Sequence, residues 1–523
     1  MDQQNNPNQN STLLGGNEFI RVLIALAFIL VSGFYASTLG IGVSNVSILA
    51  VASAIGAYMA LNIGANDVAN NVGPAVGAKA LSMTGAILIA AVFEAAGAII
   101  AGGQVVGTIK KGIIVPSAIA EAETFIWVMM AALLAGAIWL NLATYLGAPV
   151  STTHSIVGGV LGAGIAAGGW DIANWNQMIA IAASWVISPV LGGLIAAGFL
   201  IYIKRNVTYK GDMLEAAKKT VPLLVGLMVW AFSTYLILKG LKKLWSLDIV
   251  SAGLIGFAIA LTAYFAVRPV VEKAAASLSN TKDDVNNLFT LPLIVSAALL
   301  SFAHGANDVA NAIGPLAAIT DALTTGAVSS KAAIPLWVML VGAIGIAIGL
   351  ALFGPKLIRT VGTEITELDK TRAYCVAMAA AITVIIASQL GLPVSSTHIA
   401  VGGVFGVGFL REYLKVSYDK KLAAIISHSE DAGHDGKQTQ AFVERFKQAG
   451  VEEKRAILRE LKQEQASSPI SSRERKGLKK ATKKELVKRS ALLRIAAAWV
   501  ITVPASGILS AAIFYMLLGY SLS

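Results

Sequence analysis

Two stretches of the sequence carry the same unusual motif. Residues 64–71 read GANDVANN and residues 305–312 read GANDVANA, and each follows a long run of apolar residues. Both copies place an aspartate between asparagines. A charge inside a membrane is costly unless a partner or an ion neutralises it. The recurrence of the septapeptide therefore indicates two halves of one site, where a bound cation pairs with the carboxylates.

The composition is that of a membrane protein. Of the 523 residues, 56% are hydrophobic and 14% are charged, whereas a soluble domain carries about 25% charged residues. The only cysteine, Cys375, excludes an intrachain disulfide and a cysteine-based metal cluster. Apolar runs long enough to span about 30 Å of hydrocarbon occur at residues 19–39, 43–63, 80–103, 124–146, 178–203, 221–238, 247–267, 289–303, 332–354, 372–390 and 491–518.

A second motif recurs in the same order as the first. It reads GAPVSTTHSIVGGVLG at residues 147–162 and GLPVSSTHIAVGGVFG at residues 391–406. The first motif repeats after 241 residues and the second after 244, so order and spacing were kept through a duplication. The likeness extends to residues 181–199 and 495–514, which are displaced further by a basic insert.

The orientation of the two halves depends on residues 148–168. Without a crossing there, six crossings separate the two GANDVAN spans and the halves are parallel, whereas a seventh inverts them. The charge of the loops favours seven crossings, because residues 204–219, 268–282 and 355–372 then lie on the same side of the membrane as the basic insert. We therefore expect an all-α polytopic membrane protein of about 12–13 membrane segments, including broken helices or hairpins, in two inverted repeats.

Charge is concentrated in one segment. Residues 411–489 hold 20 Lys/Arg and 12 Asp/Glu, a net of +8 out of +11 for the chain. We interpret this excess as a juxtamembrane positive-inside signal rather than a site for anionic lipid or nucleic acid. The predicted units are a disordered tail (1–17), an N-terminal membrane repeat (18–203), connecting helices and loops (204–285), a C-terminal membrane repeat (286–411), a basic helical cytoplasmic insert (412–490) and the final membrane helix of the C-terminal repeat (491–523).

The motif residues combine ligands for a cation with donors for an anion. Asp67 and Asp308 offer hard oxygen ligands. The neighbouring asparagines can give an oxygen to a cation or an amide to an oxyanion; they are Asn66, Asn70, Asn307 and Asn311. Glycines and a proline in each copy open the helix and free backbone groups. Three hydroxyls after a proline, in PVSTTH and PVSSTH, are typical of a half-helix N-terminus that faces an anion.

Each of these features also has an ordinary structural explanation. An intramembrane aspartate can be a packed core residue, and Ser/Thr runs often bond to the carbonyls of the preceding turn. His154 and His398 are interpreted as scaffold rather than as ligands. His304 and Glu94 have no evident counterpart in the other half. Glu94 lies in mid-span, so it is a candidate proton or cation group, or a hydrogen-bonding partner of another helix.

The doubled motifs resemble those of the PiT-type inorganic phosphate transporters. The resemblance covers roughly residues 43–203, 289–411 and 491–518. This chain departs at Asn71 and Pro74, where Ala and Thr are commoner. The resemblance implies one phosphate with its coupling cations near the midplane. The implied binding residues are Asn66, Asp67, Asn70, Ser151, Thr152, Thr153, Asn307, Asp308, Asn311, Ser395, Ser396 and Thr397. The candidate cation ligands are Asp67, Asp308, Asn66 and Asn307, together with Glu94 because of its mid-span position.

The sequence therefore predicts a secondary active transporter rather than an enzyme. We expect symport of inorganic phosphate coupled to Na⁺, or else to H⁺, without another cofactor. A proton-coupled phosphate or sulfate permease of the same family is the first alternative. An intramembrane hydrolase built on Asp67 and Asp308, or on a Ser–His pair, leaves the amides and the duplication unexplained, and an anion channel is a third class. We expect a multi-pass protein of the cell (inner) membrane, with a homodimer as a further expectation and no nucleic-acid partner.

Overall fold

The long secondary-structure elements of the computed structural model are all helices. It describes residues 18–39, 45–115, 118–119, 121–148, 150–240, 247–327, 334–363, 368–431 and 489–522. The predicted tail and most of the predicted helical insert lie outside the described residues. Within the described part, eleven helical stretches are long and apolar enough to cross a membrane. They correspond to the eleven apolar runs of the sequence, which confirms the polytopic all-α class.

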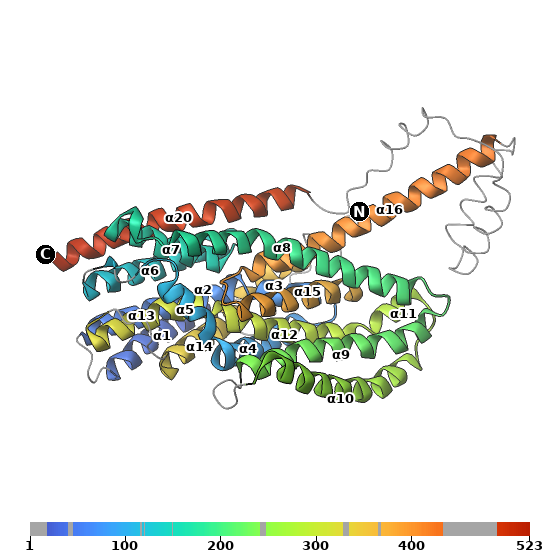
Figure 1. The fold of residues 1–523 in the computed structure, drawn as a ribbon, viewed down its shortest axis with the longest axis horizontal. Coiled ribbons are helices and arrows are strands. Elements are labelled where there is room, and N and C mark those ends of the chain that lie inside the picture. Colours follow the sequence, from blue (N-terminus) through green and yellow to red (C-terminus); the bar gives the residue numbers. More distant parts are fainter. Residues whose placement is uncertain are drawn as a thin grey trace.

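Figure 1 shows the helices as a bundle with most axes along its long direction. In chain order they are α1 (Glu18–Thr38), α2 (Val46–Asn66), α3 (Ala69–Gly77), α4 (Met83–Ala101), α5 (Gly103–Lys111), α6 (Ala122–Leu146), α7 (Thr152–Gly168), η3 (Trp170–Ile172), α8 (Trp175–Ile203), η4 (Lys204–Thr208), α9 (Met213–Lys239), α10 (Ile249–Ala275), α11 (Lys282–Asn287), α12 (Thr290–Asp308), α13 (Ala310–Thr325), α14 (Leu336–Thr363), α15 (Lys370–Gln389), α16 (Ser396–Asp431) and α20 (Arg489–Leu522).

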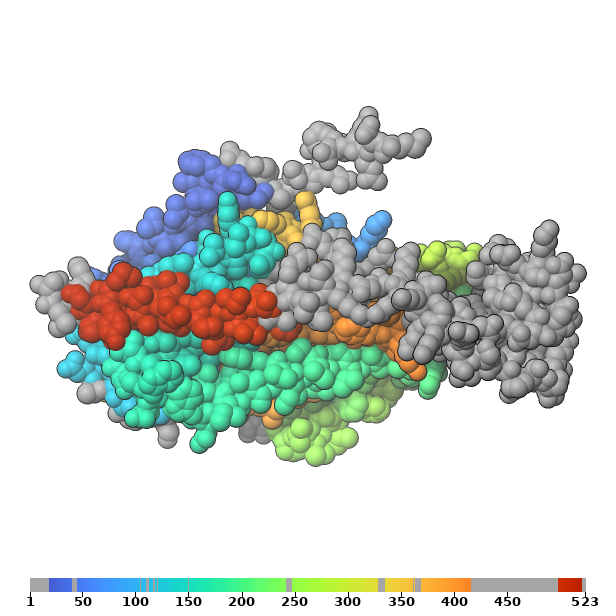
Figure 2. Space-filling view, turned by 90° about the horizontal axis from the view of Figure 1, so that it is seen from above, coloured from blue at the N-terminus to red at the C-terminus, as the bar shows by residue number. Residues whose placement is uncertain are grey.

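The two halves pack by exchanging equivalent helices. The first GANDVAN helix, α2, packs against α14, and its counterpart α12 packs against α4. The hydroxyl-motif helices follow the same rule, because α7 packs against α20 and α16 packs against α8. In Figures 1 and 2, α20 (red), from the end of the chain, lies along helices of the first half. Each motif helix therefore makes its most extensive contact with a helix of the other half.

Glycines allow the exchanged helices to touch backbone to backbone. A Cβ atom on Gly64 would lie 1.9 Å from the carbonyl oxygen of Ile346, and one on Gly305 would lie 2.2 Å from that of Glu94. Small residues at such crossings let membrane helices approach closely. The two contacts correspond, because Gly64 and Gly305 hold the same place in their motifs. They also make Ile346 the counterpart of Glu94, a match that the sequence motifs do not reveal.

The helix breaks at the acidic motifs are narrower than the sequence predicts. The α2 helix ends at Asn66 and α3 begins at Ala69, yet Asp67 and Val68 keep right-handed helical backbone angles. The amide N–H of Asn70 bonds to the carbonyl of Asp67 at 3.0 Å, three residues back instead of four. A local tightening of this kind turns the side chains without unwinding the segment. The inverted orientation of the halves stays a prediction.

Candidate functional site

The hydroxyl motifs start the α7 and α16 helices. Ser151 has an extended backbone, and its Oγ accepts the N–H of His154 at 3.1 Å. Ser395 does the same for the N–H of His398 at 3.2 Å. A serine in this position satisfies an N–H group that has no partner within the helix. The first serine of each motif is thus a helix cap, and the next two hydroxyls point toward the acidic motifs.

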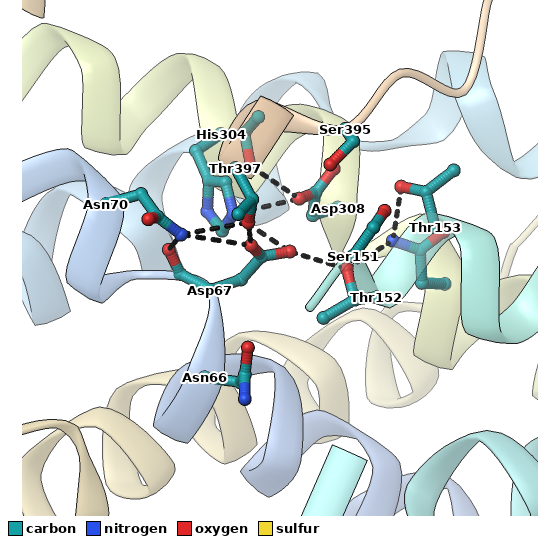
Figure 3. A network of polar contacts seen from close by, with 12 residues as sticks. Asn66, Asp67, Asn70, Ser151, Thr152, Thr153, His304, Asp308, Ser395 and Thr397 are labelled. Atoms are coloured by element: carbon teal, nitrogen blue, oxygen red, sulfur yellow. Dashed lines mark hydrogen bonds and ion pairs between the residues drawn. The ribbon is translucent and has the colours of Figure 1, made fainter. Parts of the chain in front are cut away.

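Asp67 is held by hydroxyls from both halves of the chain. Thr152 Oγ1 donates to Asp67 Oδ2 at 2.7 Å, and Thr397 Oγ1 donates to Oδ1 of the same carboxylate. The amide of Asn70 also donates to Oδ1, at 3.3 Å. Figure 3 shows these groups converging on Asp67 from separate helices. The structure therefore brings the first acidic motif together with both hydroxyl motifs.

Asp308 is held by one hydroxyl and by a histidine. Ser396 Oγ donates to Asp308 Oδ2 at 3.1 Å, and His304 Nε2 lies 2.8 Å from that oxygen. On the other side of the ring, His304 Nδ1 lies 2.7 Å from Glu94 Oε2. The Asn71 amide donates to Glu94 Oε1 at 2.7 Å. A chain of polar contacts therefore runs from Asn71 through Glu94 and His304 to Asp308.

The asparagine amides cross between the halves in matching pairs. Asn70 Nδ2 donates to Thr397 Oγ1 at 2.8 Å, and its counterpart Asn311 donates to Thr153 Oγ1 at 3.2 Å and to Thr152 Oγ1 at 3.1 Å. These bonds use the donor end of each amide, so the oxygen end is turned the other way. The second asparagine of each motif thus joins its own acidic segment to the hydroxyl segments.

The first asparagine of each motif contacts a hydroxyl that sequence reasoning missed. Asn66 Nδ2 donates to Thr144 Oγ1 at 3.0 Å, and Asn307 Nδ2 donates to Ser388 Oγ at 2.9 Å. Thr144 and Ser388 are 244 residues apart, and each lies seven residues before the first serine of its hydroxyl motif. That common register was the signal that could have identified them.

The predicted site is buried and rich in acceptor oxygens. All twelve predicted binding residues are at most 2% exposed. Four side-chain oxygens of these twelve residues have no hydrogen-bond donor within the described part of the chain, namely Oδ1 of Asn70, Asn307, Asp308 and Asn311. Burying an acceptor without a partner is costly, and a small cation is a partner that such oxygens suit. Ligand atoms of Asp67, His304 and Asp308 lie within 4.8 Å of one another.

We call these twelve buried residues the cage. The remaining predicted residues have defined places around it. Glu94 is fully buried, and both carboxylate oxygens are engaged by Asn71 and His304. A cation at Glu94 would share these oxygens with Asn71 and His304. The two motif histidines pack against tryptophans instead of facing the carboxylates. His154 lies 3.8 Å from the ring centre of Trp185, and His398 lies 3.6 Å from that of Trp499.

These features define a class of protein. A polar site buried at helix breaks and helix N-termini, inside a duplicated membrane bundle, is the plan of a secondary transporter. The chain matches the phosphate transporter family over residues 63–510. It therefore belongs to that family, and it is a phosphate transporter of the membrane, not an enzyme.

Individual relatives cover from about two thirds to nearly all of the chain. A protein of Helicobacter pylori strain J99 that is named as a phosphate permease is 52% identical over 506 residues, which is 95% of each chain. One so named from Pyrococcus abyssi is 40% identical and covers 68% of this chain and 87% of its own. A solved structure titled as the sodium-dependent phosphate transporter has a TM-score of 0.72 and 33% identity, over 90% of this chain and 99% of that one.

Proposed function

We propose that the protein is a sodium-coupled phosphate symporter. The observation that carries the proposal is the balance of the buried site, which holds two carboxylates and three unpartnered amide oxygens in one cage. Among the described residues no lysine or arginine is buried. Phosphate is an anion at neutral pH, so the carboxylates would repel it strongly in a buried site unless cations lie between them. Two carboxylates call for at least two cations.

The two kinds of motif have different tasks in this proposal. Asp67 and Asp308, with the free amide oxygens beside them, hold the cations. The Thr152, Thr153 and Thr397 hydroxyls, at the N-termini of α7 and α16, face the phosphate oxygens. The site contacts come from both halves, so a relative movement of the halves would open the cage to one side of the membrane and then to the other.

Sodium is the favoured coupling ion. Hard oxygen ligands from Asp, Asn, Ser and Thr suit Na⁺, and the solved relative is titled as sodium-dependent. His304 beside Asp308 is the observation that keeps proton coupling as the second candidate, because an imidazole can carry a proton to that carboxylate.

Phosphate is favoured over sulfate by the surplus of acceptors. Phosphate keeps an O–H group near neutral pH and sulfate has none, so only phosphate can donate to the Asn or Asp oxygens of the cage. Uptake of labelled phosphate into proteoliposomes with imposed Na⁺ or H⁺ gradients tests both assignments. We expect accumulation that requires Na⁺ and resists competing sulfate. Uptake that follows pH alone, or equal inhibition by sulfate, would contradict them.

We also propose that the two halves are inverted in a cell (inner) membrane. Seven crossings between the acidic motifs place residues 212 and 440 on the cytoplasmic side and Ser523 outside. Reporter tags at these three positions test the arrangement in whole cells. Tags at 212 and 440 that report opposite sides would leave parallel halves as the explanation. A homodimer stays an expectation.

A further inference from the structure

A second cavity lies away from the buried cage, at the end of the bundle where η4, α11 and the start of α15 meet. Its volume is about 290 Å³. Four basic side chains line it, one from each of four elements: Lys204 on η4, Lys282 on α11, Arg372 on α15 and Arg411 on α16. Two acidic side chains, Asp283 and Asp369, share the lining. The lining therefore carries an excess of positive charge.

The positive charges act on one another across this cavity. Lys282, Arg372 and Arg411 each repel the charge of Lys204, and Asp369 is the opposing negative group. Asp369 is also paired with Arg372 at 2.7 Å. Converging like charges destabilise the folded protein unless an anion compensates them. The positive-inside rule explains why loops carry basic residues. It does not explain why four elements place basic side chains in the lining of the same cavity.

The walls of the cavity are fixed by hydrogen bonds. Asn286 Oδ1 accepts the N–H of Thr371 at 3.0 Å and its hydroxyl at 2.9 Å, which joins α11 to the start of α15. Lys370 Nζ donates to Asn287 Oδ1 at 2.8 Å and adds to the same joint. A site whose shape is set before binding spends little energy on ordering its ligand groups.

The floor of the cavity is apolar. Ile203, Val207 and Phe289 line it and are at most 1% exposed. A low-dielectric floor strengthens the attraction between the basic groups and an anion above them. Arginine and lysine approaching from several directions match a group with several charged oxygens, and phosphate is such a group.

We propose that this cavity binds a phosphate group, from inorganic phosphate or from an anionic lipid headgroup, separately from the transport site. The two sites are joined by α16, which starts at Ser396 beside Asp308 and reaches Arg411 fifteen residues later. At a rise of 1.5 Å per residue this is about 22 Å. The α15 helix makes a second connection, from Arg372 at the cavity to Ser388 beside Asn307.

Neighbouring residues offer a matched pair of variants. Lys204 lines the cavity, whereas Arg205 is exposed and does not line it. Lys204→Gln and Arg205→Gln remove one positive charge each from the same short element. Phosphate binding to the full chain is measured in detergent by equilibrium dialysis at constant ionic strength. In parallel, the chain is reconstituted with equal amounts of phosphatidylglycerol and phosphatidylcholine, and the bound phosphatidylglycerol is measured by mass spectrometry. Sodium-driven uptake by each variant serves as the folding control.

We expect Lys204→Gln to lower the binding affinity for either inorganic phosphate or phosphatidylglycerol roughly tenfold, which is the effect of one lost hydrogen bond to a charged group. Arg205→Gln should leave the affinity for both unchanged. Loss of inorganic phosphate identifies the free ion as the ligand, and loss of phosphatidylglycerol identifies the lipid. Equal effects of the two variants, or none from either, would overturn the proposal. The proposed sodium coupling is tested by uptake alone, whereas the proposed cavity site is tested by the two binding measurements. Failure of one proposal can therefore be told from failure of the other.

Discussion

The two carboxylates of the site occupy equivalent places but have different neighbours. Asp67 receives hydroxyls from Thr152 and Thr397, whereas Asp308 receives Ser396 and faces His304. The GANDVAN register pairs His304 with Ile63. The duplication has therefore preserved the frame of the site while changing the charge on one side of it.

The difference extends to the helix behind Asp308. Glu94, which holds His304, corresponds to Ile346, and Asn71 corresponds to Ala312. On the Asp308 side, the polar residues Asn71, Glu94 and His304 stand where the other side has the apolar residues Ala312, Ile346 and Ile63. A buried charge is retained in a membrane only when it has partners and a use. This comparison indicates that the Asp308 side carries a task that the Asp67 side does not.

The largest effect is expected from the carboxylates themselves. Asp67→Asn and Asp308→Asn each remove a charge that neutralises a bound cation, so phosphate uptake should fall about a hundredfold or more. Both proteins should still insert, because asparagine preserves the shape of the side chain. Uptake in proteoliposomes, normalised to inserted protein, is the measurement. Wild-type uptake by either variant would refute a cage that needs both carboxylates.

The Glu94–His304 pair is expected to behave as a unit. Glu94→Ile and His304→Ile introduce the residue found at the equivalent place in the other half, and each leaves a buried ionisable partner without its contact. Each single change should cost about 3–5 kcal/mol. The double variant should lose less than the sum, since it removes both partners. Thermal melting of the purified chain in detergent gives the comparison, and strictly additive losses would show that the pair is not coupled.

The glycine crossings should matter less than the buried charges. Gly64→Ala and Gly305→Ala place a methyl group against the carbonyl oxygens of Ile346 and Glu94. Separating those helices should cost about 1–3 kcal/mol. Gly198→Ala and Gly253→Ala are matched controls, because a methyl group there meets nothing within 4 Å. A melting temperature that falls equally in all four variants would mean that the crossings are not close contacts.

The sequence predicts the frame of the protein well because hydrophobic runs and repeated motifs are local signals. Both acidic motifs and both hydroxyl motifs meet in one buried cage, as their duplication indicates. Glu94 could be identified because an acid in mid-span is costly. Its partner His304 lies 210 residues away, and the crossing of α4 and α12 that joins them depends on packing. Sequence spacing carries no record of that contact.

At the helix breaks, the sequence predicts more disruption of the helix than the structure has. Glycines and prolines around Asp67 predict an opened segment, yet the backbone remains helical, and only the N–H groups of Asn70 and Asn71 bond three residues back instead of four. Pro74 lies within α3, whose residues 69–75 are all buried. Packing against α14 holds the segment in helical form, where local propensity alone would loosen it.

The central claim is that two non-equivalent carboxylates bind cations that accompany one phosphate. Its most direct test is the ratio of labelled sodium to labelled phosphate taken up by the same proteoliposomes at a fixed membrane potential. We expect at least two sodium ions for each phosphate. A ratio of one, or phosphate accumulation without sodium entry, would contradict it.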